Sequence, residues 1–245
     1  MEKGKLYIVG IGPGGREEIT PRAAAAIAAS DVVAGYAPYL KLLGDLIAGK
    51  ETIASGMGSE VERCRRAVAA AAGGRTVSLV SSGDTGIYGM AGITLQVVAA
   101  QETAPEVEVI PGITAASTAA ALLGAPLMHD FAVISLSDLL TPWSLIEKRL
   151  HLAGEGDFVV VLYNPRSQGR EKQLERAREI LLQYRKGETP VGLVRNGGRA
   201  GEEVTITVLA RLLCCKVDMH STVIIGNSRS IVWQDKIITP RGYAL

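Results

Sequence analysis

Short, mainly apolar segments alternate with helix-like segments in the first half of the chain, and this alternation restricts the fold more than any other feature. The apolar segments are the expected strands, at residues 6–9, 31–34, 76–81 and 107–110. Helices are expected between them, including one over residues 60–72. Strands that alternate with helices form βαβ units, which build parallel sheets. The first half is therefore expected to hold a mainly parallel sheet covered by helices.

Capping signals mark where these helices should begin. Thr20-Pro21 places a hydroxyl residue before a proline, which favours a helix that starts at the proline. Ser59 and Glu62 have the spacing of a capping box, in which each side chain accepts a hydrogen bond from the other residue's backbone N–H. Thr114 is placed to cap a helix that ends near residue 124, and Thr141-Pro142 repeats the first pattern.

The second half has a different arrangement, because its strands crowd together with few helices between them. One helix is expected over residues 170–184, and strands are expected at residues 131–136, 158–162, 191–194, 204–208 and 222–225. Such crowding favours hairpins and a mixed sheet. The chain is therefore expected to form two α/β domains, an N-terminal domain of residues 1–114 and a C-terminal domain of residues 115–245.

Composition excludes several classes of function. The formal net charge of +1 gives no general attraction to nucleic acid or to a membrane surface. The N-terminal segment lacks the apolar core of a signal peptide. The three cysteines and three histidines lack metal-ligand spacing. We expect a cytoplasmic protein with no metal site and no nucleic-acid or membrane partner.

A glycine-rich loop follows the first expected strand. Gly10, Gly12 and Gly15 match the spacing G-x-G-x-x-G of dinucleotide-binding loops. In those loops the last glycine opens the helix, whereas here the helix cap is Thr20, five residues later. In the second expected strand, Val32-Val33 is also followed by Ala34-Gly35 and not by an acidic residue that could bind ribose. These departures disfavour a nicotinamide cofactor and leave two interpretations, a plain turn and a loop whose backbone closely approaches another group.

Three motifs resemble those of the tetrapyrrole methylase family. They are the loop from Gly10 to Thr20, the turn Ser81-Ser82-Gly83-Asp84 and the turn Pro111-Gly112-Ile113-Thr114, in the family's order and spacing. Thr85 departs from the family pattern, in which proline often follows the Gly-Asp pair. Further stretches look like the branch that methylates C-17 of precorrin-3 type tetrapyrroles, at residues 83–92, 134–143, 163–167 and 239–243.

The resemblance implies two α/β domains with S-adenosylmethionine in the cleft between them, usually in a homodimer. It also implies methyl transfer to C-17 coupled to contraction of the macrocycle, on a substrate that carries cobalt in some members. The cofactor-binding positions that it implies, some of them loosely matched, are Gly83, Asp84, Ile87, Thr114, Ala115, Tyr163, Asn164, Asn196 and Thr239. Gly12 and Pro13 are expected on the tetrapyrrole side.

The sequence also offers candidates for substrate binding and for proton transfer. A precorrin carries several carboxylates, which arginine binds well, and Arg166 and Arg195 sit in loops after strands. His129 and Asp138, near strand ends, are candidates for proton transfer during ring contraction. Each residue also has a structural alternative: Asp84 can close its turn through backbone N–H groups, and His129 can be an ordinary structural histidine.

Several functions remain open from the sequence. The leading hypothesis is C-17 methylation in cobalamin biosynthesis. The alternatives are methylation of another precorrin position or of uroporphyrinogen, an NAD-dependent oxidoreductase, and a tetrapyrrole carrier without chemistry.

Overall fold

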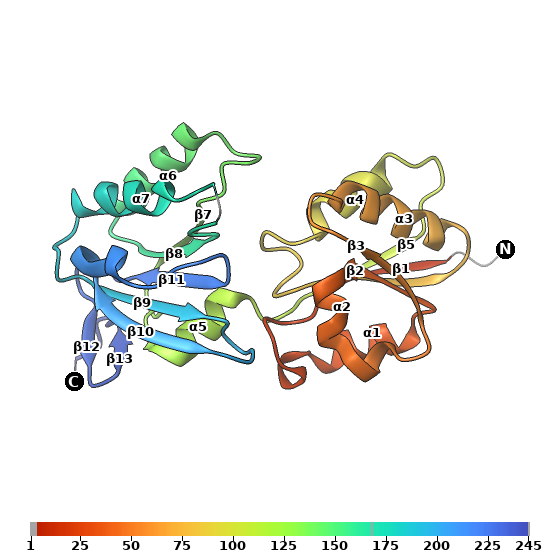
Figure 1. Ribbon diagram of the computed structural model, residues 1–245, viewed down its shortest axis with the longest axis horizontal. Coiled ribbons are helices and arrows are strands. Elements are labelled where there is room, and N and C mark those ends of the chain that lie inside the picture. The colour runs from red at the N-terminus through yellow and green to blue at the C-terminus, as the bar shows by residue number, and fades with distance from the viewer. Residues whose placement is uncertain (1–3, 168, 245) are drawn as a thin grey trace. The chain divides into compact units, whose positions relative to one another are not determined.

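The structure is a computed structural model that describes residues 4–167 and 169–244, and the chain divides into two compact units. One unit ends at Ala115 and the other begins at Ala116. Each unit has its own five-stranded sheet with an apolar core on each face, and Figure 1 labels their helices and strands along the chain.

The first unit is built on a five-stranded parallel sheet. Its strands are β1 (Lys5–Gly10), β2 (Val32–Tyr36), β3 (Glu51–Ser55), β4 (Thr76–Ser81) and β5 (Glu106–Ile110). They lie in the order β3-β2-β4-β1-β5, and every neighbouring pair is parallel. The parallel sheet expected from the sequence is confirmed. Strand β3 was missed because Ile53 is its only buried residue, so it forms no apolar run.

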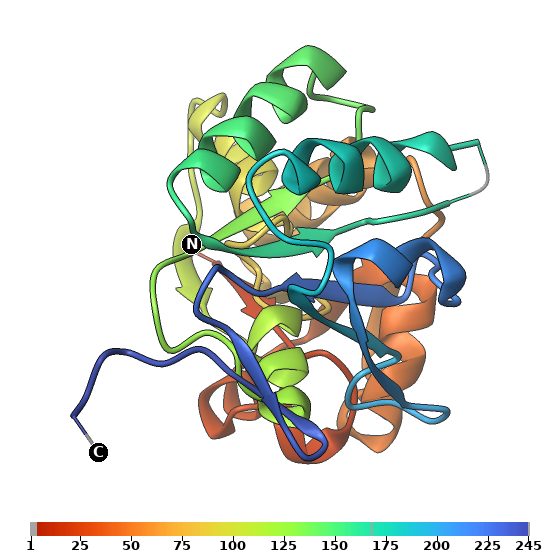
Figure 2. The ribbon, with the colours of Figure 1, turned by 90° about the vertical axis from the view of Figure 1, so that its left-hand side faces the viewer.

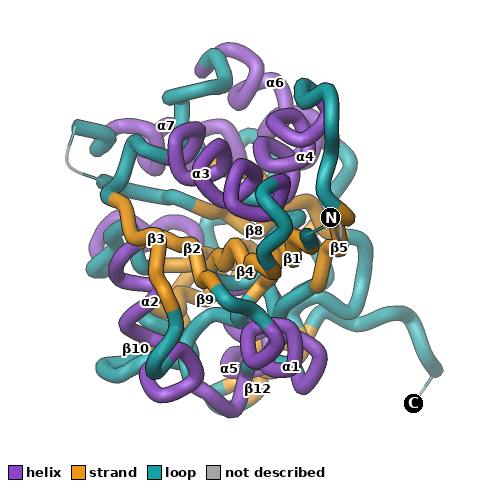
Figure 3. The backbone as a smooth tube through the Cα atoms, turned by 90° about the vertical axis from the view of Figure 1, so that its right-hand side faces the viewer, coloured by secondary structure: helices purple, strands orange, loops and turns teal. Residues whose placement is uncertain are grey.

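Helices cover both faces of this sheet, as Figure 3 shows. On one face α1 (Pro21–Ala29) and α2 (Ala37–Leu43) pack on Val9, Val33 and Val80. On the other face α3 (Glu60–Ala72) and α4 (Ala91–Ala99) pack on a second apolar cluster that includes Ile8 and Leu79. Two short 3₁₀ helices, η1 (Arg16–Glu18) and η2 (Gly44–Ile47), complete the unit. Burial on both faces explains why β1, β2 and β4 are mainly apolar.

Of the capping predictions at Thr20 and Ser59, the first is confirmed and the second is wrong. The Thr20 hydroxyl accepts a hydrogen bond from the backbone N–H of Ala23 at 3.2 Å, and α1 begins at Pro21. Ser59 is the N-cap of α3, but its side chain makes no capping hydrogen bond. A carboxylate oxygen of Glu60 instead accepts from the backbone N–H of Gly58 at 3.1 Å. The turn before α3 is therefore closed by the neighbouring glutamate and not by a capping box.

The second unit has a mixed five-stranded sheet, as expected. Its strands are β7 (Phe131–Ser135), β8 (Val159–Tyr163), β9 (Pro190–Arg195), β10 (Glu203–Val208) and β11 (Ser221–Ile225), in the order β10-β9-β11-β8-β7. Only β7 and β8 pair in parallel. A small sheet of β12 (Ile231–Trp233), β13 (Lys236–Ile238) and β6 (Gly124–Ala125) was missed, because its strands are too short to give a pattern.

Helices also cover both faces of the second sheet (Figure 2). One core packs under α6 (Trp143–Glu155), α7 (Lys172–Leu182) and the 3₁₀ helix η3 (Leu209–Cys214). The other lies under α5 (Ala115–Leu123) and β13. The cap predicted at Thr141 is wrong, because Pro142 is extended, with ψ of 137°, and is itself the N-cap of α6. Among the helices of residues 4–167 and 169–244, none is long and apolar enough to cross a membrane.

An ion-pair network stabilises the end of this sheet at which β9 stops. Arg195, the last residue of β9, donates to Asp218 at 2.6 Å and to Glu203 at 3.2 Å. Burial alone would raise the pKa of Asp218, but hydrogen bonds from Arg195, from the backbone N–H of His220 and from Ser221 lower it below its ordinary value of 3.8. The network therefore joins the end of β9 to the turn before β11.

This lowered pKa gives a pH-dependent stability. A carboxyl whose pKa falls on folding stabilises the protein above its unfolded pKa, and this stabilisation is lost as the pH falls through the folded pKa. We expect the free energy of unfolding of the wild type to exceed that of Asp218→Asn at pH 6, and the difference to vanish as the pH falls from about 5 through the lowered pKa. Urea unfolding across this range measures it. A difference that grew toward acid pH would contradict the prediction.

Candidate functional site

Three loops meet at the carboxyl edge of the first sheet. Because the sheet is parallel, all five strands end at this edge, and β4, β1 and β5 are neighbours. The chain leaves β1 toward β2 on one side and leaves β4 toward β5 on the other. The position between β1 and β4 is therefore a topological switch point, where open α/β sheets commonly bind ligands. The three family-like motifs are the loops that follow these three strands.

The first two loops are joined by backbone hydrogen bonds. The N–H of Gly12 donates to the carbonyl of Gly83 at 3.1 Å, and the N–H of Gly83 donates to the carbonyl of Gly12 at 2.7 Å. Both residues have left-handed backbone angles, with φ of 76° and 69°, which glycine adopts without steric cost. These two glycines form an isolated antiparallel bridge that joins the loop after β1 to the loop after β4.

The third loop approaches so closely that only glycine fits. A Cβ on Gly10 would lie 2.6 Å from the nitrogen of Gly112 and 2.7 Å from the carbonyl oxygen of Gly83. A Cβ on Gly112 would overlap the same carbonyl oxygen. Gly10 therefore makes room for the protein's own backbone. This agrees with the interpretation of a closely approaching loop and argues against a pyrophosphate site.

Asp84 ties two of the loops together. One carboxylate oxygen accepts from the N–H of Gly86 at 2.7 Å, and the other accepts from the N–H of Gly112 at 2.9 Å. The structural alternative, a turn closed by backbone N–H groups, is thus present. Each oxygen has a second lone pair, so this half-buried carboxylate keeps acceptor capacity for a ligand.

The remaining residues of the first unit that were predicted to bind cofactor or substrate lie beside the place where the three loops meet. Thr114 and Ala115 lie about 4 Å from the position that a Cβ on Gly83 would take. Ile87 is 41% exposed, more than an ordinary core residue would be. Gly12 and Pro13, expected on the substrate side, are both buried.

The second unit gathers most of its candidates at one edge as well. The carboxyl ends of β7, β8 and β9 lie there, because β9 is antiparallel to β11 and β11 is antiparallel to β8. Tyr163, at the end of β8, accepts a hydrogen bond on its hydroxyl from the backbone N–H of Ala116, in the first turn of α5, at 2.7 Å. Asn164 has a φ of 51° and donates to the Ser135 hydroxyl at 2.9 Å.

The other candidates at this edge differ in the hydrogen bonds and ion pairs that they form with neighbouring residues. Asn196 has a φ of 52° and donates to the carbonyl of Gly201 at 3.2 Å. Asp138 accepts from Gln173 at 3.0 Å. Arg166 lies 3.8 Å from Glu171 and has 43% of its side chain exposed. Arg195 already has two carboxylate partners, so its charge is less available to a substrate than that of Arg166.

An exposed apolar pair also lies at this edge. Leu139 and Leu140, in the loop after β7, have 84% and 94% of their surface exposed. The hydrogen bond between Asp138 and Gln173 holds the base of this loop against α7.

His220 and Ser221 reach the same edge but were missed from the sequence. Ser221 pairs in register with Arg195, and the carbonyl of His220 accepts from the N–H of Asn196 at 3.0 Å. The antiparallel β11 brings its first residues to this edge, where β7, β8 and β9 bring their last. The polar start of an otherwise apolar strand was the available signal.

Two predicted residues lie elsewhere. Thr239 is fully buried, and its hydroxyl shares a hydrogen bond with Ser230 at 2.7 Å, so it packs the small sheet. His129 precedes β7 whereas Asp138 follows it, so the two lie at opposite edges of the sheet.

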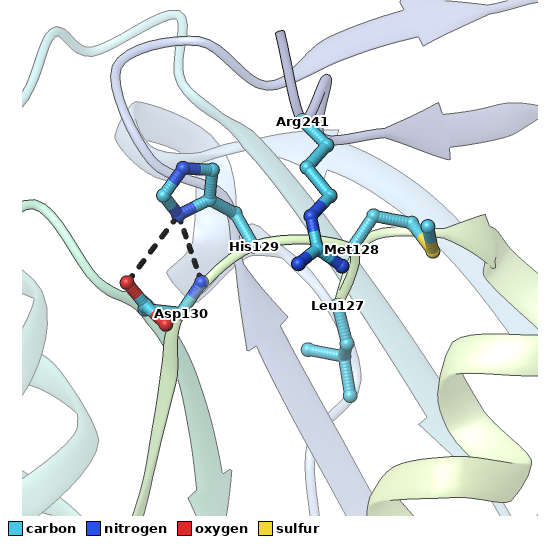
Figure 4. Close-up of a pocket in the computed structure, with 5 residues that line it drawn as sticks. All are labelled: Leu127, Met128, His129, Asp130 and Arg241. Carbon is cyan, nitrogen blue, oxygen red and sulfur yellow. Dashed lines mark hydrogen bonds and ion pairs between the residues drawn. The ribbon is translucent and has the colours of Figure 1, made fainter. Parts of the chain in front are cut away.

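His129 lines a separate pocket of about 340 Å³ (Figure 4). The other lining residues are Leu127, Met128, Asp130 and Arg241. His129 accepts on Nδ1 from the backbone N–H of Asp130 at 2.9 Å, a local structural bond. Within the described part of the chain, no group of three His, Cys, Asp or Glu residues could hold a metal ion.

Comparisons with known proteins agree with this geometry. The model of the tetrapyrrole (corrin/porphyrin) methylases matches residues 5–213. The chain is 50% identical over 240 residues to a probable cobalt-factor III C(17)-methyltransferase of Salmonella typhimurium, covering 98% of this chain and 100% of the relative. It is 39% identical over 249 residues to a precorrin-3B C(17)-methyltransferase of Sinorhizobium sp, covering 98% of each.

Some relatives are longer than this chain. A cobalt-factor III methyltransferase of Priestia megaterium is 49% identical over 245 residues, which cover 98% of this chain but 45% of the relative. This chain thus spans about half the length of that protein.

A solved structure shows the same fold over nearly the whole length. The methyltransferase CobJ superimposes with a TM-score of 0.91 at 34% identity, covering 97% of this chain and 100% of that chain. A family match over most of the chain, close relatives and shared architecture lead to one conclusion: the chain is a methyltransferase of the tetrapyrrole methylase family.

Proposed function

We propose that the protein transfers a methyl group from S-adenosylmethionine to C-17 of a precorrin-3 type tetrapyrrole, with contraction of the ring, in cobalamin biosynthesis. The convergence of the three family loops at one sheet edge is the observation that carries the proposal. The relatives named for cobalt-factor III are 42% to 50% identical to the chain, and the one named for precorrin-3B is 39% identical. This difference favours the cobalt-containing substrate.

The place where the loops after β1, β4 and β5 meet suits S-adenosylmethionine. The glycine backbones allow close approach, and the Asp84 carboxylate is a suitable neighbour for a cationic molecule. The residues that would hold the cofactor there are Gly83, Asp84, Ile87, Thr114 and Ala115. When bound, the cofactor supplies a methyl group already activated by its sulfonium. The chain therefore needs no nucleophilic side chain and has to position the reactants and exclude water.

The second-unit edge supplies further candidates. Tyr163, Asn164 and Asn196 remain proposed cofactor-side residues, and His220 and Ser221 join them because they share that edge. Thr239 is left out because its side chain is buried and hydrogen-bonded. The expected role of residues 115–245 in completing the cofactor cleft is part of this proposal.

Substrate recognition is proposed to combine a charge with an apolar surface. Arg166 can bind a peripheral carboxylate of the tetrapyrrole, whereas Arg195 mainly stabilises its own edge of the sheet. Leu139 and Leu140 offer an apolar surface to the macrocycle. Asp138 lies beside these leucines, whereas His129 lies at the opposite edge of the sheet. Asp138 is therefore the better placed of the two candidates for proton transfer. A homodimer and a cytoplasmic location remain expectations from the family.

Asp84→Asn is expected to weaken the binding of S-adenosylhomocysteine roughly tenfold or more while the protein stays folded. An amide has no charge, and its nitrogen cannot accept the hydrogen bond that one of Gly86 and Gly112 now donates. Titration calorimetry measures the affinity, with Asp45→Asn, an exposed residue of η2, as the matched control. Unchanged affinity in the Asp84 variant would remove it from the cofactor site, and binding of NAD would overturn the cofactor assignment.

The double variant Leu139→Ser, Leu140→Ser is expected to raise the KM for the tetrapyrrole roughly tenfold or more, because apolar surface that the macrocycle would cover is lost. Its affinity for S-adenosylhomocysteine should not change. Leu152→Ser, which alters an exposed residue near the far end of α6, is the control. A folded double variant with an unaltered KM would show that the substrate does not cover this loop.

Product analysis tests the reaction itself. Incubation with cobalt-factor III or metal-free precorrin-3B and S-adenosylmethionine should add one methyl group and change the absorption spectrum of the macrocycle. We expect faster turnover with the cobalt-containing substrate. Methylation at a position other than C-17, located by nuclear magnetic resonance, would replace the proposal with the within-family alternative.

A further inference from the structure

The pocket beside His129 lies away from the residues proposed for methyl transfer. It is lined by residues 127–130, which precede β7, and by Arg241, which follows β13 (Figure 4). The cofactor-side candidates of the same unit lie at the opposite edge, where β7, β8 and β9 end. The pocket therefore needs an explanation of its own.

Parallel pairing of two short strands builds this pocket. Strand β13 pairs in parallel with β6. The N–H of Thr239, the residue after β13, donates to the carbonyl of Ala125, the last residue of β6, at 3.1 Å. The chain after β13 consequently runs beside the chain after β6, and this register brings Arg241 to Met128.

A buried hydrogen-bond network holds a second arginine near the first. The hydroxyls of Ser230 and Thr239 share a hydrogen bond at 2.7 Å. The Asn227 side-chain oxygen accepts from the Ser230 hydroxyl at 3.2 Å and from the backbone N–H of Arg229 at 3.0 Å. Asn227, Ser230 and Thr239 are all at least nine-tenths buried. The network thus joins the turn that carries Arg229 to the segment that carries Arg241.

Both arginine side chains are available to a ligand. Nη1 of Arg229 lies 3.9 Å from the position that a Cβ on Gly242 would take, and Gly242 directly follows Arg241. Both arginines are exposed. Among the described residues, none forms a hydrogen bond or an ion pair with either guanidinium group. Two neighbouring cations without counter-ions favour the binding of an anion.

His129 adds a hydrogen-bond donor to the pocket. Its Nδ1 accepts from the backbone N–H of Asp130 at 2.9 Å, so the neutral ring carries its proton on Nε2. Figure 4 shows Nε2 pointing away from Asp130, whose own side chain is 82% exposed. The other acidic neighbour, Asp157, accepts from the backbone N–H of Ser228 at 2.9 Å and from its hydroxyl at 2.6 Å.

Two apolar side chains complete the lining. Leu127 is half-buried against the core under α5, and Met128 is 46% exposed. The volume of about 340 Å³ is at the small end of the range for ligand pockets. An apolar wall beside cationic donors suits an organic anion better than an inorganic one.

We propose that this pocket is a second ligand site, which binds an organic dicarboxylate with an apolar body. Arg241 binds one carboxylate, with Nε2 of His129 as a further donor, and Arg229 binds the other. The apolar body lies on Leu127 and Met128. Guanidinium groups bind carboxylates through paired hydrogen bonds, so two arginines favour two carboxylates. The proposal is independent of the methyl transfer, because it uses none of the residues proposed for that reaction.

A titration with small carboxylates tests the site. The ring protons of His129 can be followed by nuclear magnetic resonance, and His129→Gln identifies their signals. Benzene-1,3-dicarboxylate should shift them saturably, with half-saturation below about 10 mM. Benzoate lacks the second carboxylate, glutarate lacks the ring, and inorganic phosphate lacks both. Each should bind at least about fivefold more weakly.

Single substitutions separate the two arginines. Arg241→Gln and Arg229→Gln should each weaken benzene-1,3-dicarboxylate binding roughly tenfold or more. Arg229→Gln should leave benzoate binding unchanged, whereas Arg241→Gln should weaken it. Both variants should bind S-adenosylhomocysteine like the wild type, so failure here is distinct from failure of the proposed cofactor site. Arg211→Gln, an exposed change in η3, is the matched control.

A larger probe distinguishes two sources of such a ligand. Uroporphyrin carries carboxylates on a macrocycle, and its displacement of benzene-1,3-dicarboxylate from the wild type would support a tetrapyrrole as the ligand. Selective binding of the small dicarboxylate alone would support a small metabolite. The proposal is overturned if benzene-1,3-dicarboxylate leaves the His129 signals unmoved, if phosphate binds as tightly, or if Arg241→Gln binds the dicarboxylate like the wild type.

Discussion

The close contact of three backbone segments at the carboxyl edge of the first sheet is the constraint on which the candidate site depends. Gly10, Gly83 and Gly112 approach one another so closely that side chains at Gly10 and Gly112 would collide with backbone atoms. The contact fixes the turn that carries Asp84, and Asp84 in turn accepts a hydrogen bond from the loop after β5. The glycines thus allow the three loops to pack closely against one another. The functional groups are supplied by other residues of these loops.

The sequence predicted those parts of the fold whose signal is local. The apolar runs of β1, β2, β4 and β8 and the Thr20 cap were visible because burial on both faces and a capping hydroxyl leave a pattern within a few residues. Strand β3 and the small sheet were not visible, because β3 has a single buried residue and β6, β12 and β13 have two or three residues each. Ser59 matched a capping box by spacing, but Glu60 forms the competing bond to Gly58.

The residues of the candidate site, too, were predictable where their signal is local and not where it depends on the topology. Asp84 and Thr114 could be identified from motifs, because each lies in a short turn with a recognisable composition. His220 and Ser221 were missed, because a polar start to a strand does not show which edge it reaches, and it is the antiparallel register of β11 that brings them to the edge where Asn196 lies. Thr239 and His129 stay predictions, although the buried Thr239 hydroxyl shares a hydrogen bond with Ser230 and His129 lies at the other end of β7 from Asp138. Knowing which end of each strand faces the site requires the topology.

The hydrogen bond between Tyr163 and Ala116 has a consequence for the order in which the second unit forms. An amide in the first turn of α5 finds its acceptor 47 residues later in the chain, at the end of β8. During synthesis, α5 therefore leaves the ribosome before the group that satisfies this amide exists. The start of α5 can reach its final state only after β8 has joined the sheet, so this helix should mature late although it comes first in its unit.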